Sequence, residues 1–132
     1  MRNLLSFLII VLTSTSSFSQ ENGAYTIFDS KGKKVKYSKM LKALDASQII
    51  LFGEYHDNPI THWLQYEVTA SLQKTNNLVL GSEVMEADNQ DELDQYLAEE
   101  IDANGLDTLA RLWPNYKTDY KPLVDLAKEN KL

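Results

Sequence analysis

The only two histidines of the chain lie close together in the sequence, and carboxylates surround them. Glu54 and His56 form a Glu-x-His motif, His62 follows shortly after, and Glu83 and Glu86 come later in the chain. Imidazole and carboxylate groups are ligands for Zn, Mn or Fe, and the same groups act as general acids and bases. The sequence therefore predicts a ligand or metal cluster of these five residues and leaves its chemistry open between the two roles.

Two short apolar runs must position this cluster. Residues 49–52 read Ile-Ile-Leu-Phe, residues 78–80 read Leu-Val-Leu, and a glycine follows each run. Continuous apolar runs of this length are typical of strands buried on both faces of a parallel sheet. Ligands bind beyond the carboxyl ends of such strands, so the polar groups after both runs are expected to meet at one edge. A right-handed crossover brings the first turn of the intervening helix, with His62, to the same edge.

The remaining segments read as a hairpin and several helices. A hairpin is expected over residues 25–37, with a turn signal at residues 29–32. Helices are expected over residues 38–45, from Pro59 to a stop at residues 76–77, over residues 89–97 and 107–112, and from residue 120 to a C-terminus at residues 128–131. Strands that alternate with helices predict an α/β fold with a parallel sheet flanked by helices. A third strand is expected after the last helix, so we interpret the chain as an incomplete N-terminal portion of a larger three-layer domain.

Several of these residues also have purely structural interpretations. Glu54 and Glu83 could cap the helices that follow them, and His56 could be a loop histidine with satisfied hydrogen bonds. Residues 113–116, Trp-Pro-Asn-Tyr, either pack a loop onto the last helix or form a flat wall for a planar ligand. For residues 113–116 we favour packing onto the last helix. For Glu54, Glu83 and His56, each taken alone, a structural role and a functional role are equally well supported, and the convergence of the carboxylates and histidines favours a site.

The first residues have the pattern of an export signal. Arg2 precedes the apolar residues 4–12, and Ser17 and Ser19 give a small-x-small cleavage pattern, so we predict a signal peptide at residues 1–19. The alternative is an uncleaved anchor, but the apolar run is far shorter than the ~20 residues that span a bilayer. The mature chain, residues 20–132, is therefore expected to be exported to the periplasm or the cell surface.

Charge and cysteine content exclude several classes of partner and site. Lys and Arg number 13 against 19 Asp and Glu, for a net charge of -6, and no basic stripe is present, which argues against nucleic acid. The chain has no cysteine, which excludes disulfides, thiolate metal sites and a lipoprotein cysteine.

Three motifs together resemble a known family. Residues 52–59 read Phe-Gly-Glu-Tyr-His-Asp-Asn-Pro, and residues 81–86 read Gly-Ser-Glu-Val-Met-Glu. Residues 113–116, followed by Asp-Tyr-Lys-Pro-Leu-Val at residues 119–124, form the third motif. In order and spacing they resemble the ChaN-like haem-binding uptake family of the Tiki/TraB/erythromycin-esterase superfamily. The resemblance covers nearly all of residues 20–132, as the N-terminal part of a ChaN-like haem-binding domain.

The resemblance implies a haem-binding protein of iron or haem uptake rather than an enzyme, with no catalytic residue assigned. It implies haem held between two subunits of a homodimer, with a tyrosine on the iron and His and Lys contacts to the propionates. It also implies outer-membrane uptake machinery as a partner. The chain offers four candidates for the iron ligand: Tyr55, Tyr66, Tyr116 and Tyr120.

Two other functions remain open. Related branches of the superfamily are similar to metal-dependent hydrolases, which would place a divalent metal on the Glu-x-His motif and a second glutamate. The C-terminal half of the family, with its further strands and histidine motif, is absent from this chain. That departure leaves a third possibility, a truncated remnant without a function of its own.

Overall fold

The computed structural model describes residues 23–132, so the predicted signal peptide lies outside the described residues. The described chain begins with a hairpin of β1 (Ile27–Phe28) and β2 (Lys34–Val35), with Ile27 opposite Val35. The carboxylate of Asp29 accepts hydrogen bonds from the backbone nitrogens of Lys31 and Lys33 at 3.0 and 2.9 Å. These bonds hold the turn, and the predicted hairpin is confirmed.

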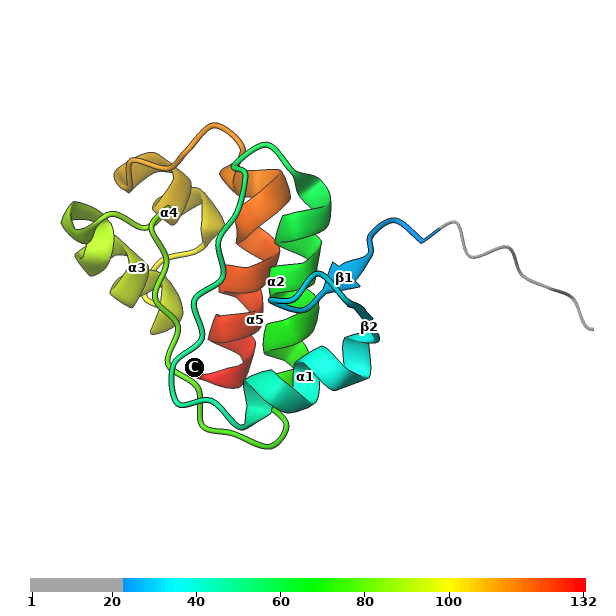
Figure 1. Ribbon diagram of the computed structural model, residues 1–132. Helices are drawn as coiled ribbons and strands as arrows, with labels where there is room; N and C mark the ends of the chain where they lie inside the picture. The colour runs from blue at the N-terminus through cyan, green and yellow to red at the C-terminus, as the bar shows by residue number, and fades with distance from the viewer. Residues whose placement is uncertain (1–22) are drawn as a thin grey trace, which may run out of the picture.

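Helices make up most of the described chain. They are α1 (Tyr37–Asp45), α2 (Pro59–Leu72), the 3-10 turn η1 (Ala87–Asn89), α3 (Gln90–Leu97), α4 (Ala103–Leu109), the π-helical turn η2 (Tyr116–Tyr120) and α5 (Lys121–Asn130). Helices α2 and α5 pack side by side, α1 crosses the end of α2, and α3 and α4 form a group on the other side of α5 (Figure 1). Over residues 23–132, no helix has the length and apolar character needed to cross a membrane.

The predicted α/β fold with a parallel sheet is wrong. Within residues 23–132 the only sheet is the antiparallel pair of β1 and β2. Residues 49–52 and 78–80 are extended but form no ladder, and Leu51 and Val79 are 92% and 95% exposed. A run becomes a strand only when a neighbour pairs with its backbone. The apolar pattern identified the two extended segments, but in the described chain no other segment forms backbone hydrogen bonds of a sheet with either of them.

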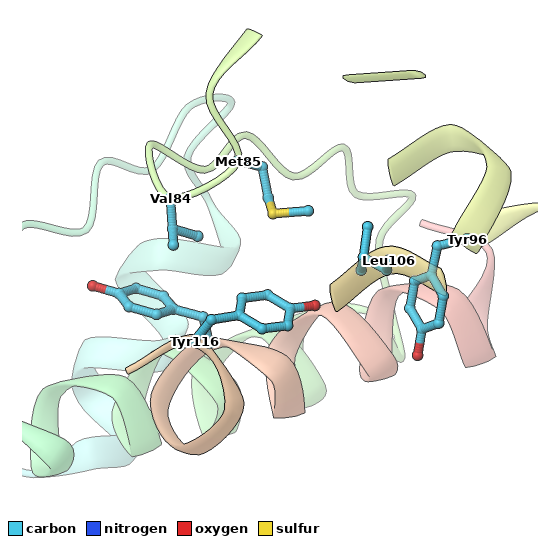
Figure 2. Packing of buried hydrophobic residues seen from close by; sticks show 6 residues of the cluster. Val84, Met85, Tyr96, Leu106 and Tyr116 are labelled. Carbon is cyan, nitrogen blue, oxygen red and sulfur yellow. The ribbon is translucent and has the colours of Figure 1, made fainter. Parts of the chain in front are cut away.

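The core lies where helices α3 and α4 and turn η2 meet the turn that follows residues 78–80. Figure 2 shows this cluster, in which Val84 and Met85 from that turn face Tyr116 of η2. Val84 and Leu106 are each only 1% exposed. Burial of these side chains fixes the turn against η2.

The start of α2 depends on a single side-chain cap. The Oδ1 atom of Asn58 accepts hydrogen bonds from the backbone nitrogens of Ile60 and Thr61 at 3.0 and 3.1 Å, and Pro59 occupies the first turn. Because an uncapped helix leaves these donors without a partner, we expect Asn58→Ala to lower the free energy of unfolding by about 1 kcal/mol. Urea denaturation measures this change. The control Asn58→Ser keeps an acceptor and should stay close to the wild type, and equal stabilities of all three proteins would contradict the role of the cap.

Candidate functional site

The carboxylate of Glu54 is the centre of a hydrogen-bonded network. Its Oε1 accepts from the hydroxyl of Tyr120 at 2.5 Å and lies 3.1 Å from Nδ1 of His56, and its Oε2 accepts from Nε2 of Gln65 at 2.6 Å. These donors come from η2, from the loop before α2 and from α2 itself. No donor is a backbone N–H, so Glu54 does not cap a helix; Asn58 does. The side chain of Glu54 is only 13% exposed and is held in one position.

His62 lies directly behind this carboxylate and is 3% exposed. Its Nε2 lies 3.1 Å from the carbonyl oxygen of His56, which identifies Nε2–H as the donor of that bond. Its Nδ1 lies 3.2 Å from Oε2 of Glu54 but has no hydrogen-bond partner in the required geometry. If His62 carries a second proton, Nδ1 becomes an ion-pair partner of Glu54. The predicted proximity of Glu54, His56 and His62 is therefore what the structure shows.

Asn115 and the rings around it close the network from the side of η2. Its Nδ2 donates to the carbonyl oxygen of His56 at 2.7 Å and to Oδ2 of Asp119 at 2.8 Å. Trp113 packs edge-on against the ring of His56, with 4.7 Å between centroids, and against Tyr120 at 5.8 Å. Trp113 thus packs against Tyr120, the residue that precedes α5, and against His56.

The environment changes the acidity of three groups. Burial alone raises the pKa of Glu54, but hydrogen bonds from Tyr120, His56 and Gln65 and the nearby His62 outweigh it, so the pKa lies below the ordinary 4.5. Burial, followed by the contact with Glu54, raises the pKa of the Tyr120 hydroxyl well above 10, and burial does the same for Tyr116. Both tyrosines therefore remain protonated at neutral pH; the hydroxyl of Tyr120 donates to Glu54, and the buried hydroxyl of Tyr116 has no hydrogen-bond partner among the described residues.

A small cavity of about 190 Å³ opens beside the network. Residues from the ends of both extended segments line it, with Glu83 on the same cavity as Glu54 and His56. Glu86 lies elsewhere, because the buried Val84 and Met85 turn the chain away and its carboxylate pairs with Arg111 at 2.7 Å. The cavity is lined by Phe52, Gly53, Glu54, His56, Gln65, Gly81, Ser82, Glu83 and Val84.

Sequence reasoning did not assign Gln65, Asn115 and Asp119 to the site. A signal existed for Gln65, which lies three residues after His62 on one helix face. For Asn115 no local signal existed, because its contact with His56 joins residues 59 positions apart. Tyr120 was predicted only as an iron ligand, whereas the structure makes it the donor that fixes Glu54.

The arrangement provides hydrogen bonding rather than a ready metal site. Across residues 23–132, no group of three His, Cys, Asp or Glu side chains is placed to hold a metal ion. Both oxygens of Glu54 already accept hydrogen bonds from Tyr120 and Gln65, which competes with coordination. Among the candidate iron ligands, Tyr55 is 79% exposed, Tyr66 is partly buried, and Tyr116 and Tyr120 are buried at 4% and 6% exposure.

Comparison with known proteins identifies a family for this chain. A family model described as "Haem-binding uptake, Tiki superfamily, ChaN" matches residues 40–132. No curated protein and no solved structure matches the chain. The matched residues include the Glu54 network, the cavity beside it and all four candidate tyrosines.

Proposed function

Because the chain belongs to the ChaN family of haem-binding uptake proteins in the Tiki superfamily, we propose that it is an exported haem-binding protein of iron or haem uptake. The family match over residues 40–132 carries this proposal. The export step rests on the leader pattern of residues 1–19. In this role the protein would exchange haem with outer-membrane uptake machinery.

Tyr55 is the tyrosine best suited to hold the iron. A tyrosine binds haem iron as a phenolate, so its hydroxyl must be accessible and able to lose its proton. The hydroxyl of Tyr120 donates to Glu54, Tyr116 is buried in the core, and the raised pKa of each disfavours the phenolate. Tyr55 is 79% exposed and lies between Glu54 and His56, whose positions the network fixes.

His56 offers a second group beside Tyr55. Its Nδ1 is paired with Glu54 at 3.1 Å, and its side chain is 57% exposed. When Nδ1–H donates to the carboxylate, the Nε2 lone pair becomes the available atom, and a carboxylate partner makes such an imidazole a stronger ligand or base. Glu54 thus orients His56 and keeps it in one tautomer.

The shape of the site favours haem on the surface rather than haem enclosed in a pocket. The cavity beside Glu54 measures about 190 Å³, below the roughly 300 Å³ at which pockets for small molecules begin. Tyr55 is exposed and Phe52, nearby in the sequence, is partly exposed. Their side chains instead offer an exposed aromatic surface to one face of a planar ligand. Bound haem supplies a redox-active iron with an axial position for a protein ligand.

Haem titration tests the proposal. We expect a saturable shift of the Soret band when ferric haem is added to the purified chain at micromolar concentration. Metal-free protoporphyrin is the matched ligand control and should bind more weakly, because it lacks the iron that a tyrosine would ligate. A shift that never saturates, or equal binding of both porphyrins, would contradict a specific site.

A further inference from the structure

The chain as a whole is acidic, but residues 31–42 form a basic segment, contrary to the expectation of no basic stripe. Six of the chain's 13 Lys and Arg residues lie in this segment, and none of its 19 Asp and Glu residues does. Residues 83–107 are the opposite, with ten Asp and Glu residues and no Lys or Arg. The net charge of -6 therefore hides two oppositely charged regions, which we term the basic pole (residues 31–42) and the acidic pole (residues 83–107).

The fold keeps the two poles apart. The basic pole covers the end of the hairpin and much of α1, and α1 packs on α2. The acidic pole includes η1, α3 and most of α4, and α3 packs on α4 and α5. In Figure 1 the hairpin and α1 lie beside α2, whereas α3 and α4 lie on the other side of α5. This charge asymmetry would orient the protein in front of a charged surface.

The lysines of the basic pole form no ion pairs in the described chain. All six are exposed. Within residues 23–132, the Lys and Arg side chains that pair with carboxylates are those of Arg111, Lys117 and Lys121, which lie outside the pole. Because like charges at this density repel one another, an external anionic partner would stabilise the cluster.

An exposed aromatic ring lies among these lysines. Phe28 is opposite Lys34 in the antiparallel register of β1 and β2, so both side chains leave the hairpin on the same face. Phe28 is 60% exposed, and Lys34 is exposed as well. On the opposite face, Ile27 and Val35 are partly buried. An apolar ring beside several lysines is the composition of surfaces that bind at the interface of an anionic membrane.

The residue types favour a membrane over an acidic protein as the partner. Recognition of individual carboxylates favours Arg, whose planar fork binds a carboxylate through two hydrogen bonds. All six basic residues of the pole are lysines, which act as point charges on flexible stems. Such groups suit a surface with mobile anionic headgroups, where no fixed geometry is required. The exposed ring of Phe28 adds an apolar contact that the acyl boundary of a bilayer accepts.

We propose that the basic pole, together with Phe28, binds the surface of a membrane rich in anionic phospholipid, and that the acidic pole points away from the membrane. This inference goes beyond the proposed haem binding and does not depend on it, because it uses only the hairpin, α1 and the charge distribution. Haem is left out of the tests, so the two proposals fail separately.

Vesicle sedimentation tests the partner. The purified protein should bind vesicles that contain phosphatidylglycerol mixed with phosphatidylcholine, and should bind vesicles of phosphatidylcholine alone far less. Raising the salt from about 0.1 M to about 1 M shortens the Debye length from about 10 Å to about 3 Å and should release the protein. Equal binding to the two kinds of vesicle, or binding to neither, would overturn the proposal. Binding of soluble poly-glutamate as tightly as of the anionic vesicles would also overturn it, in favour of an acidic protein.

Two lysines of α1 test whether the basic pole carries the binding. Lys39→Gln combined with Lys42→Gln should weaken vesicle affinity about thirtyfold, because each lysine near an anionic surface contributes about fivefold. Lys117→Gln combined with Lys131→Gln removes the same charge outside the pole and should leave the affinity within about twofold of the wild type. Equal losses in the two double variants would contradict the assignment to this face.

A polarity-sensitive label tests the orientation. The chain has no cysteine, so Phe28→Cys and Leu109→Cys each supply a single thiol for labelling. Both positions are 60% exposed, but Leu109 ends α4, next to the acidic pole. When anionic vesicles are added, the emission of the label at position 28 should shift to the blue and that of the label at position 109 should not. Shifts of equal size, or a shift at position 109 alone, would refute the proposed orientation.

Discussion

Tyr55→Phe is expected to weaken ferric haem binding by about a hundredfold or more, because the variant removes the oxygen that ligates the iron. The substitution leaves the ring and its apolar contacts in place. Tyr55 is 79% exposed and no hydrogen bond of its hydroxyl is present among residues 23–132, so the fold should not change. The measurement is a Soret titration of wild type and variant. Loss of the charge-transfer absorption of a ferric phenolate should accompany the lower affinity.

Tyr66→Phe is the matched control for this experiment. Tyr66 lies on α2, is partly buried and also loses only a hydroxyl in the variant. We expect its haem affinity and visible spectrum to equal those of the wild type. If Tyr66→Phe loses haem and Tyr55→Phe keeps it, the assignment of the iron ligand to Tyr55 is wrong, although a haem site would remain.

Glu54→Gln is expected to lower the free energy of unfolding at neutral pH by about 3 kcal/mol. The variant replaces an acceptor oxygen by a donor amide and leaves Gln65 or Tyr120 without its partner. Hydrogen bonds to a charged group are worth about 1.5–3 kcal/mol each, and Glu54 accepts them from Tyr120 and Gln65 in a site with 13% exposure. Denaturant unfolding followed by tryptophan fluorescence measures the change, since Trp113 packs against the network.

The same variant should change how stability depends on pH. The pKa of Glu54 is lower in the folded protein than its ordinary value of 4.5, so the folded state favours the ionised form. This contribution is fully present above pH 4.5 and is lost as the pH falls through the folded pKa. In Glu54→Gln this part of the acid destabilisation should be missing, and the two stability curves should approach each other at low pH.

Glu100→Gln is the charge-matched control for both measurements. Glu100 is exposed, and no hydrogen bond of its side chain is present in the described residues. Loss of the Glu100 charge should change the free energy of unfolding by less than about 0.5 kcal/mol. Equal effects of the two substitutions would mean that net charge, rather than the network around Glu54, accounts for the result.

Local sequence patterns predicted the elements whose stability is local. The hairpin at β1 and β2, helix α2 with its Asn58–Pro59 start, and helix α5 with Pro122 in its first turn all agree with the structure. Each depends on residues within a few positions of one another, such as a cap or a turn carboxylate. The same applies to the proximity of His56 and His62, which one loop and one helical turn bring together.

The sheet was predicted wrongly because strand formation is not local. Residues 49–52 and 78–80 have the composition of buried strands, and the structure keeps them extended but unpaired. An apolar run indicates that the side chains of a segment should be buried, whereas backbone pairing into a sheet requires a second segment at hydrogen-bonding distance.

The sequence by itself determined the family, the Glu-x-His motif and the helices that carry the site. Only the tertiary structure decided that Tyr120 fixes Glu54 and that Asn115 fixes His56. It also decided that Glu83, but not Glu86, lines the cavity beside them. Among the four candidate iron ligands, it showed that Tyr55 is the exposed one. The physical reason is distance along the chain. Contacts between residues more than fifty positions apart depend on how helices pack, and no local pattern records that packing.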